Sequence, residues 1–330
     1  MVVDCHVHVS ACTPEHGEMS AKLQRSFAFR FMRWRLKVKG YDANAERQIA
    51  ERLRTTLEQT TELDAAVILA FDSVYDRDGT LNQSATHLHV KNDYVMELAK
   101  KHPKMLFGAS VNPYRKDAVV ELERCIAAGA VLLKWLPVTQ NFDPSDEKCF
   151  AMYEVLAHYK LPLLCHTGGE KSLPMLNARV ADPGLLEPAL RRGVTVIAAH
   201  CGTRSAHDEP DYVPRFMRLA REFENCYGDT AALNLPTRSY AWQHVLNDPV
   251  VRAKLVHGSD WPIPAFPPVS QLGWSEFLPL FWDSNWMRRD VRIKHRLGLG
   301  PDYWNRATTL LRLPARVPGV PKDQGVGARG

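Results

Sequence analysis

Residues 2–8, with the sequence Val-Val-Asp-Cys-His-Val-His, predict a buried β-strand near the start of the chain. β-Branched residues suit a pleated surface that other elements cover. Side chains alternate along a strand, so His6 and His8 are expected on one face, with Asp4 one layer behind them. Two imidazoles at this spacing supply half of a transition-metal site. Two buried, hydrogen-bonded histidines would give the same pattern, and the rest of the chain has to decide between the two interpretations.

Seven further apolar segments follow, most of them about 30 residues apart, the length of one strand–helix unit. They cover residues 63–70, 105–111, 130–136, 161–166, 194–200, 225–231 and 254–259. Continuous apolar strands that alternate with helices indicate a parallel sheet with both faces covered. Eight such units predict an α/β fold, the (β/α)8 TIM barrel, as a single domain over residues 1–313.

Helical patterns fill the gaps between these strands. Residues 117–128 and 183–192 each end before a glycine, which commonly terminates a helix. Ser145 is the expected N-cap of the next helix after residue 136. The last helix is expected over residues 303–313, and residues 314–330 are expected to be a disordered tail because they are rich in Gly, Pro and charge.

Two insertions, at about 11–62 and 263–300, interrupt the alternation of strand and helix. The first is predicted to be helical, with a regular apolar pattern over residues 44–60. Its centre interleaves aromatic and cationic residues. The simplest interpretation is an amphipathic helix that packs Phe27, Phe31 and Trp34 on the barrel while its arginines reach solvent. A lid or a dimer contact is the alternative. The second insertion is rich in Pro and Trp and could wall the mouth of the barrel.

The overall composition limits the class of protein. Hydrophobic residues make up 45% and charged residues 24% of the 330, and the formal net charge is +5. That charge is too weak to argue for nucleic acid, and no apolar run reaches membrane-spanning length. Seven cysteines without paired spacing predict reduced thiols in a cytoplasmic protein. The expected partner is a small-molecule substrate, and the aromatic insertion is compatible with a homodimer.

Polar side chains stand at the predicted C-terminal ends of the strands, where a barrel of this kind places its active site. Strand one ends in His6 and His8, and strands four, five, six and eight end in Lys134, His166, His200 and Asp260. Each of them alone could be a loop anchor or half of an ion pair. Buried together without a cation they would be costly, whereas neutral imidazoles and a carboxylate are natural donors for a divalent metal. Strands two, three and seven offer Asp72, Asn112 and Asp229 with less pattern to support them.

The order Asp-x-His-x-His, then Lys, His, His and Asp at these strand ends, resembles the amidohydrolase superfamily. Within it, the chain is most similar to the amidohydrolase-related branch that includes aminocarboxymuconate-semialdehyde decarboxylase. The resemblance covers residues 1 to about 313 except the two insertions. It implies one or two divalent ions, zinc first, with manganese, iron or cobalt as alternatives.

Two ligand sets follow from this resemblance. In a binuclear site, Lys134 would be carboxylated and would bridge two metals, one held by His6, His8 and Asp260 and the other by His166 and His200. In a mononuclear site, one zinc would be held by His6, His8, His166 and Asp260, and His200 would be a free acid–base or polarising group.

The resemblance and Lys134 favour a hydrolase that cleaves an amide, lactone or ester bond in a small, anionic molecule. The metal would activate water, Asp260 would take the proton of that water, and His200 would polarise the carbonyl. Glu170 and Arg204, on loops past two of the histidines, are candidate substrate-binding residues. Decarboxylases of this branch usually lack the lysine, so a non-oxidative decarboxylase of an unsaturated or aromatic acid is the alternative. A non-catalytic binding barrel is a further alternative.

Other histidines and cysteines are expected to be structural. His87 and His89 form a second His-x-His at the expected start of a helix, where residues two apart face different ways. Strand alternation predicts that Cys5 and Cys165 face outward, into the layer between strands and helices, as small core residues.

Overall fold

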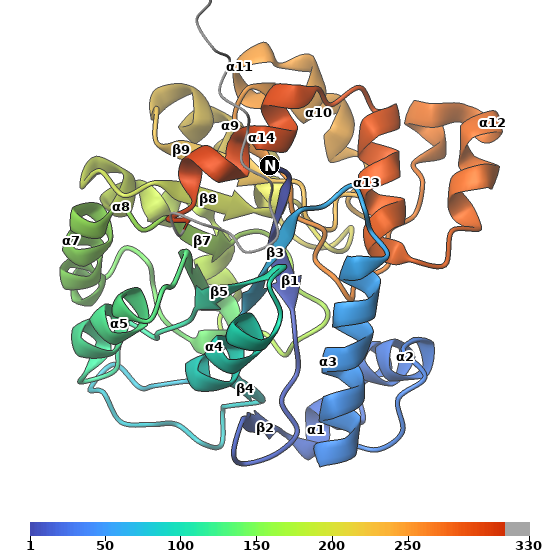
Figure 1. The fold of residues 1–330 in the computed structure, drawn as a ribbon. Helices are drawn as coiled ribbons and strands as arrows, with labels where there is room; N and C mark the ends of the chain where they lie inside the picture. The colour runs from blue at the N-terminus through green and yellow to red at the C-terminus, as the bar shows by residue number, and fades with distance from the viewer. Residues whose placement is uncertain (314–330) are drawn as a thin grey trace, which may run out of the picture.

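Eight parallel strands form one curled sheet in the computed structural model, which describes residues 1–313 (Figure 1). The predicted disorder of residues 314–330 concerns a segment outside the described residues. The strands follow one another around the sheet in chain order. They are β1 (Val3–His8), β3 (Ala65–Leu69), β5 (Met105–Ala109), β6 (Leu132–Trp135), β7 (Leu163–His166), β8 (Val196–Ala199), β9 (Cys226–Asp229) and β10 (Leu255–Val256).

The two edges of this sheet meet between β1 and the segment after β10. The amide of Cys5 donates a hydrogen bond to the carbonyl of His257 (3.0 Å), and the amide of His8 donates to Trp261 (2.8 Å). In the opposite direction, the amide of Asp260 donates to the carbonyl of His6 (2.8 Å). These bonds close the circle and confirm the predicted (β/α)8 barrel. The C-terminal ends of all eight strands therefore share one rim.

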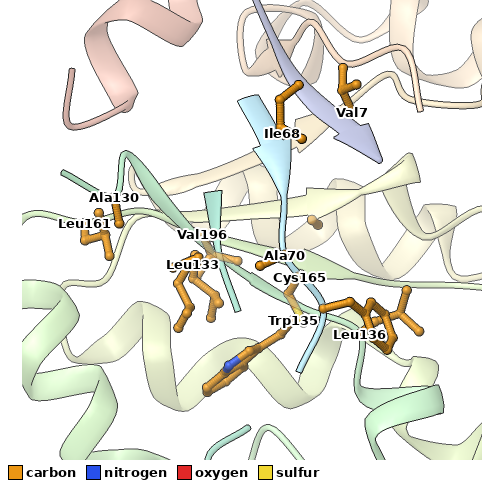
Figure 2. Close-up of a cluster of buried hydrophobic side chains, with 14 of the residues drawn as sticks. Val7, Ile68, Ala70, Ala130, Leu133, Trp135, Leu136, Leu161, Cys165 and Val196 are labelled. Carbon is orange, nitrogen blue, oxygen red and sulfur yellow. The ribbon is translucent and has the colours of Figure 1, made fainter. Parts of the chain in front are cut away.

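Helices cover the outside of the sheet and enclose the larger part of the core. They are α4 (Asn92–Lys101), α5 (Ala118–Ala127), α6 (Pro137–Gln140), α7 (Phe150–Tyr159), α8 (Glu187–Arg191), α9 (Val213–Glu222), α10 (Ala241–Asn247) and α11 (Pro249–Arg252). Between strands and helices, Ile68, Leu133, Trp135 and Val196 are fully buried. Figure 2 shows part of this layer, which also holds Cys165, as predicted.

A second, smaller cluster fills the inside of the barrel. Its residues come from strands all around the sheet and include Val67, Leu132, Leu164 and Ile197. The last helix, α14 (Pro301–Leu310), adds Ala307 to this cluster and contacts β1 and β10. In Figure 1, α14 lies beside the N-terminus, at the end of the barrel from which β1 starts. The apolar interior and α14 thus close that end and leave the opposite rim for polar groups.

Two details of the predicted helices are wrong. A 3-10 turn (Glu147–Cys149) precedes α7, and Asp146 rather than Ser145 caps it by accepting a hydrogen bond from the amide of Lys148. The helix predicted over residues 183–192 divides into a 3-10 turn (Pro183–Leu186) and α8. Pro188 lacks an N–H to donate, so it can stand only in the first turn of a new helix.

An irregularity in β1 changes which side chains face the barrel interior. Asp4 pairs with Ala66 and Val7 pairs with Ile68, so Cys5 and His6 together stand opposite one residue of β3. This β-bulge shifts the alternation by one residue. The expectation that Cys5 faces outward is therefore wrong, because Cys5 belongs to the interior cluster. Asp4 does not lie behind the histidines either: its carboxylate accepts from the amides of His6 (3.1 Å) and Ser259 (2.9 Å).

Residues between β1 and β3 form a cover at the rim where β1 ends (Figure 1). They comprise β2 (Gly17–Met19), α1 (Ala21–Gln24), α2 (Phe27–Arg35) and α3 (Ala43–Glu58). β2 pairs in antiparallel register with β4 (Leu88–Val90), a strand that contains His89 and directly follows His87. The expectation that His87 and His89 stand at the start of a helix is thus wrong.

The α2 helix turns a different face to the barrel than predicted. Phe27 and Trp34 are 85% and 71% exposed, so neither packs on the barrel. Phe31 lies between these two rings and stacks on Trp286. Trp286 begins α13 (Trp286–Arg296), which with the kinked α12 (Val269–Phe281) follows β10.

Two further findings concern the whole described chain. All seven cysteines are free thiols, and six of them are buried. Over residues 1–313, no helix has both the length and the hydropathy that a bilayer span requires.

Candidate active site

Three side chains from the two joined edges of the sheet converge at the rim. Nε2 of His6 lies 3.1 Å from Nε2 of His8. Oδ1 of Asp260 lies 3.3 Å from the first nitrogen and 3.2 Å from the second. His6 is fully buried, whereas His8 remains partly exposed toward the open side. A ligand held by these atoms would join the first and last strands of the barrel.

Asp229, at the end of β9, fixes the orientation of His6. Nδ1 of His6 donates to Oδ2 of Asp229 (2.6 Å), so Nε2 carries the free lone pair that faces His8 and Asp260. The other carboxylate oxygen accepts from the amides of His200 (2.7 Å) and Ala231 (3.1 Å). Burial raises the pKa of Asp229, while the His200 amide opposes that rise. Asp229 thus acts on the cluster through His6 and the backbone of His200.

His166 and His200 complete a group of four imidazoles. The ring of His200 lies 4.8 Å from that of His166 and 5.2 Å from that of His6, measured between centroids. Nδ1 of His200 donates to the carbonyl of Ala231 (2.9 Å), which leaves its Nε2 as an acceptor. Burial, reinforced by nearby cations, holds the pKa of His6, His166 and His200 well below the usual value. All three are therefore neutral at pH 7, which is the form that binds metals.

Lys134 reaches the same cluster from β6. Its Nζ lies 3.1 Å from Nε2 of His6, and the side chain is 1% exposed. Burial lowers the pKa of this amine, although Asp229 and Asp260 oppose the shift. A lowered pKa increases the share of the neutral amine, which carboxylation of a lysine requires.

Backbone strain is concentrated at the strand ends that carry the site. His200 (φ 60°) and Asp260 (φ 63°) both adopt left-handed conformations that side chains rarely take. Each costs on the order of 1–3 kcal/mol, a cost that persists mainly at functional sites. Gly258 is required for the same packing, because a Cβ there would lie 2.8 Å from Cβ of His6.

The arrangement fits a divalent metal. Within residues 1–313, Nε2 of His166 is buried without a hydrogen-bond partner, and its ring lies 4.8 Å from that of His200. His6, His8 and Asp260 present ligand atoms within 4.8 Å of one another. Neutral imidazole nitrogens and one carboxylate oxygen are the donors that zinc and similar ions prefer. A metal ligand role would account for the unpartnered nitrogen of His166 and for the close approach of the donors of His6, His8 and Asp260.

A cavity of about 1010 Å³, its open mouth included, leads from this cluster to solvent. His8, His166, His200 and Asp260 line its floor. Its walls are mainly apolar and come from the barrel rim, the cover after β1 and the segment after β10: Phe29, Met32, Leu36, Val38, Ile49, Leu69, Phe71, Leu88, Leu136, Leu173, Trp261 and Ile263. A concave, mainly apolar lining with a few polar groups at one end is typical of small-molecule sites.

The two predicted substrate-binding residues have different outcomes. Glu170 lines the cavity, and its Oε2 lies 3.9 Å from Nδ1 of His166. Burial raises the pKa of Glu170, and backbone amides of Leu173 and Ser172 oppose the rise. Arg204 instead stacks its guanidinium on the ring of Tyr240 at 5.1 Å. Arg238, which the sequence pattern did not single out, is the buried arginine here.

Arg238 joins two loops at the rim. Its guanidinium donates to the carbonyls of Gly169 (2.7 Å) and Thr203 (3.2 Å), and to the hydroxyl of Ser205 (2.6 Å). It thereby fixes the loops after β7 and β8, which carry His166 and His200. Arg238 lies on an irregular loop after β9 and has no periodic signal that could have identified it.

Asp72 and Asn112 belong to a separate network. Asp72 accepts from the amides of Ser73 (2.8 Å) and Asn112 (2.7 Å), and Arg115 approaches it at 3.3 Å. The side-chain amide of Asn112 donates to the carbonyls of Ser73 and Gln140. These residues connect the loops after β3, β5 and β6 rather than joining the histidine cluster.

Solved structures of similar fold support this architecture. A TIM-barrel protein from Bordetella bronchiseptica, described as uncharacterized, has a TM-score of 0.58 at 15% identity, over 94% of this chain and 95% of that one. A probable 2-pyrone-4,6-dicarboxylic acid hydrolase from Acinetobacter baumannii, with citric acid bound, has a TM-score of 0.57 at 16% identity, over 94% and 98%. For 5-carboxyvanillate decarboxylase from Sphingomonas paucimobilis the values are 0.55 and 13%, over 95% and 99%. At these identities the likeness concerns the fold alone.

No curated protein matches the chain. The family model described as amidohydrolase matches residues 3–289, which include all of the strands and all of the clustered side chains. The chain therefore belongs to the amidohydrolase family and is an enzyme of the metal-dependent amidohydrolase superfamily.

Proposed function

We propose that this enzyme hydrolyses an amide, lactone or ester bond and that its metal is zinc. The single observation that carries the proposal is the convergence of four imidazoles, one carboxylate and one buried amine at the floor of a deep cavity. In a mononuclear site His6, His8, His166 and Asp260 would hold the ion. In a binuclear site, with Lys134 carboxylated, His6, His8 and Asp260 would hold one ion and His166 and His200 the other. When bound, zinc supplies Lewis acidity and lowers the pKa of a water molecule.

Asp260 is the proposed general base. Burial favours its neutral form, but His6 and His8 outweigh burial and hold the pKa of Asp260 below its usual value. The carboxylate is therefore ionised at pH 7 and can accept the proton of the attacking water. Its left-handed backbone and the hydrogen bond from its amide to His6 fix its direction toward the cavity floor.

His200 is the proposed group at the substrate carbonyl. Its Nδ1 is committed to Ala231, so only Nε2 faces the cavity. In the binuclear site Nε2 would be a ligand. In the mononuclear site Nε2 would take a proton from solvent when substrate binds, and the resulting N–H would donate to the oxygen that gains negative charge. The apolar walls exclude water, which strengthens either interaction.

The apolar walls also favour a second candidate, non-oxidative decarboxylation. A carboxylate that loses its hydration in such a cavity is raised in energy relative to neutral CO₂. The two reactions differ in their products, because hydrolysis consumes water and decarboxylation releases CO₂.

The test is the variant Asp260→Asn. It should keep the circular dichroism spectrum and lose nearly all turnover, by at least 10²-fold, because general base catalysis contributes roughly 10²–10⁴-fold. Products would be followed by mass spectrometry and CO₂ detection with a panel of esters, lactones, amides and aromatic acids. Wild-type turnover in Asp260→Asn would refute the assignment of the base, and CO₂ release without hydrolysis would select the second candidate.

A further inference from the structure

One face of the α2 helix lines the active-site cavity with a stripe of four side chains. Phe29, Met32, Arg33 and Leu36 all line it, at the i, i+3, i+4 and i+7 spacing of a single helical face. Three members of the stripe are apolar, and the fourth is a cation. Ile49 of α3 and Val38 between the two helices continue the apolar surface. The cover after β1 therefore forms a wall of the cavity and contributes chemistry to it.

Arg33 is the one lysine or arginine among the described residues that line the cavity. Its guanidinium lies over the ring of Tyr41, 4.8 Å from the centroid, and the side chain is half-buried. Over residues 1–313 it forms no ion pair with a carboxylate. Stacking on Tyr41 leaves the in-plane N–H donors unused, because a cation–π contact engages the face of the guanidinium. A half-buried cation with free donors is a site for an anion.

The remainder of the wall excludes most anions. A polyanion would need several cations or many hydrogen-bond donors, whereas the other members of the stripe, Phe29, Met32 and Leu36, are apolar. A molecule with one negative group and a broad apolar body satisfies both the guanidinium and the walls. Aromatic and long aliphatic bodies suit them equally, because the lining contains rings as well as aliphatic side chains.

We propose that the cavity takes hydrophobic monoanions and that Arg33 of α2 binds their negative group while the apolar stripe binds their body. This inference rests on the proposed function for the identity of the site and adds the class of substrate. It modifies the sequence-based expectation of a small anionic substrate, because most of the contact surface is apolar. Arg33 then determines the specificity for substrate, and it belongs to the cover after β1 rather than to the barrel.

The test measures binding by isothermal titration calorimetry, without turnover, in both zinc-loaded and chelator-treated protein. The ligands are 1-naphthoate as a hydrophobic monoanion, 1-naphthalenemethanol as its neutral counterpart and citrate as a polyanion. Wild type should bind 1-naphthoate more tightly than citrate. Arg33→Met should weaken 1-naphthoate about tenfold or more, the loss expected for a charge-assisted hydrogen bond. It should change binding of the alcohol less than twofold, which shows that the cavity stays intact.

Arg30→Met is the matched control, because Arg30 lies on the same helix but is exposed and outside the cavity lining. It should leave all three affinities unchanged. Tighter binding of citrate, or an equal loss in Arg30→Met and Arg33→Met, would overturn the proposal. An effect of Arg33→Met that vanishes in chelator-treated protein would place the anion on the metal and also overturn it. Because binding needs no turnover, failure to hydrolyse any ester or amide would count against the proposed function alone.

Discussion

Asp229 connects the two halves of the histidine cluster without facing the cavity. One carboxylate oxygen holds Nδ1 of His6 and the other holds the backbone amide of His200. The same carboxylate therefore sets the tautomer of one imidazole and the strained backbone of another.

Replacing Asp229 with asparagine should weaken metal binding about 10- to 100-fold, the usual effect of losing such an outer partner. The amide offers one acceptor oxygen where two oxygens now receive three N–H groups. Competition with a chromophoric chelator measures the change in zinc affinity. Asp72→Asn is the control, since Asp72 is equally buried and accepts backbone amides in a separate network. Equal losses in the two variants would mean that general damage, rather than the contact with His6, weakens the metal site.

His257 lies outside the histidine cluster, and its burial should make the stability of the protein depend on pH. Its ring is fully buried against Trp304, and burial, with Lys294 and His295 nearby, holds its pKa well below 6.5. Below pH 6.5 the unfolded chain binds a proton at this residue that the folded chain does not bind. The wild type should therefore lose stability relative to His257→Gln as the pH falls from about 6.5, by at most roughly 1.4 kcal/mol per pH unit.

Urea unfolding of metal-free wild type and His257→Gln at pH 7.5 and pH 5 measures this difference. The free energy of unfolding of the wild type minus that of His257→Gln should be larger at pH 7.5 than at pH 5. A difference that stays constant between the two pH values would show that His257 titrates equally in folded and unfolded chains.

At the scale of elements, Glu46 holds α3 and the cover in place. It is 3% exposed and accepts hydrogen bonds from the amides of Cys12 (2.7 Å) and Thr13 (3.1 Å) and from the ring of His16. The loop that leaves β1 is thereby tied to the helix that returns toward β3. Ile49 of the same helix lines the cavity, so this anchor also positions a wall of the site.

Glu46→Ala should leave these donors without a partner and lower the free energy of unfolding by about 1–3 kcal/mol. Amide hydrogen exchange should rise in residues 12–16 and along α3, while the barrel strands keep their protection. Glu51→Ala on the same helix is the control, because Glu51 is exposed and pairs with Arg54 on the surface. If exchange rose uniformly throughout the chain, the anchor would not be a local one.

The elements also show which features the sequence could predict. The strands were predictable because eight apolar segments at regular spacing have one simple arrangement. The bulge in β1 could not be predicted, because one extra residue in a strand does not change the apolar pattern from which the strand is recognised. Cys5 was consequently expected in the wrong layer. The helical pattern of α2 was visible in the sequence, but both faces of the helix carry aromatic residues. Hydrophobicity alone therefore predicted that Phe27 and Trp34 pack on the barrel, whereas Phe29 and Met32 face the cavity.

At the scale of the whole molecule, the clustered residues were predictable from the barrel alone. Strand ends share a rim, so polar residues at five strand ends had to approach one another. The supporting residues were not predictable in the same way. Arg238 lies on an irregular loop whose course depends on tertiary contacts such as the bond from Arg238 to Gly169.

Metal binding should stabilise the whole barrel, because His6, His166 and Asp260 come from strands that are distant in sequence. Zinc at a free concentration 100 times its dissociation constant adds about 2.7 kcal/mol if it binds only the folded state. Thermal melts of chelator-treated protein with and without zinc or manganese measure the effect. His8→Ala should reduce the shift, and His89→Ala, outside the cluster, should retain it. Identical melts with and without added metal would contradict the proposed site.

The closure of the barrel through β1 also has a consequence for biosynthesis. The hydrogen bond between Asp4 and the amide of Ser259 spans 255 positions of the chain. While the ribosome is still making the middle of the protein, β1 has one neighbour to pair with and its other edge stays open. The nascent enzyme therefore cannot assemble its ligand set, and so cannot act, until the ribosome has translated past Asp260.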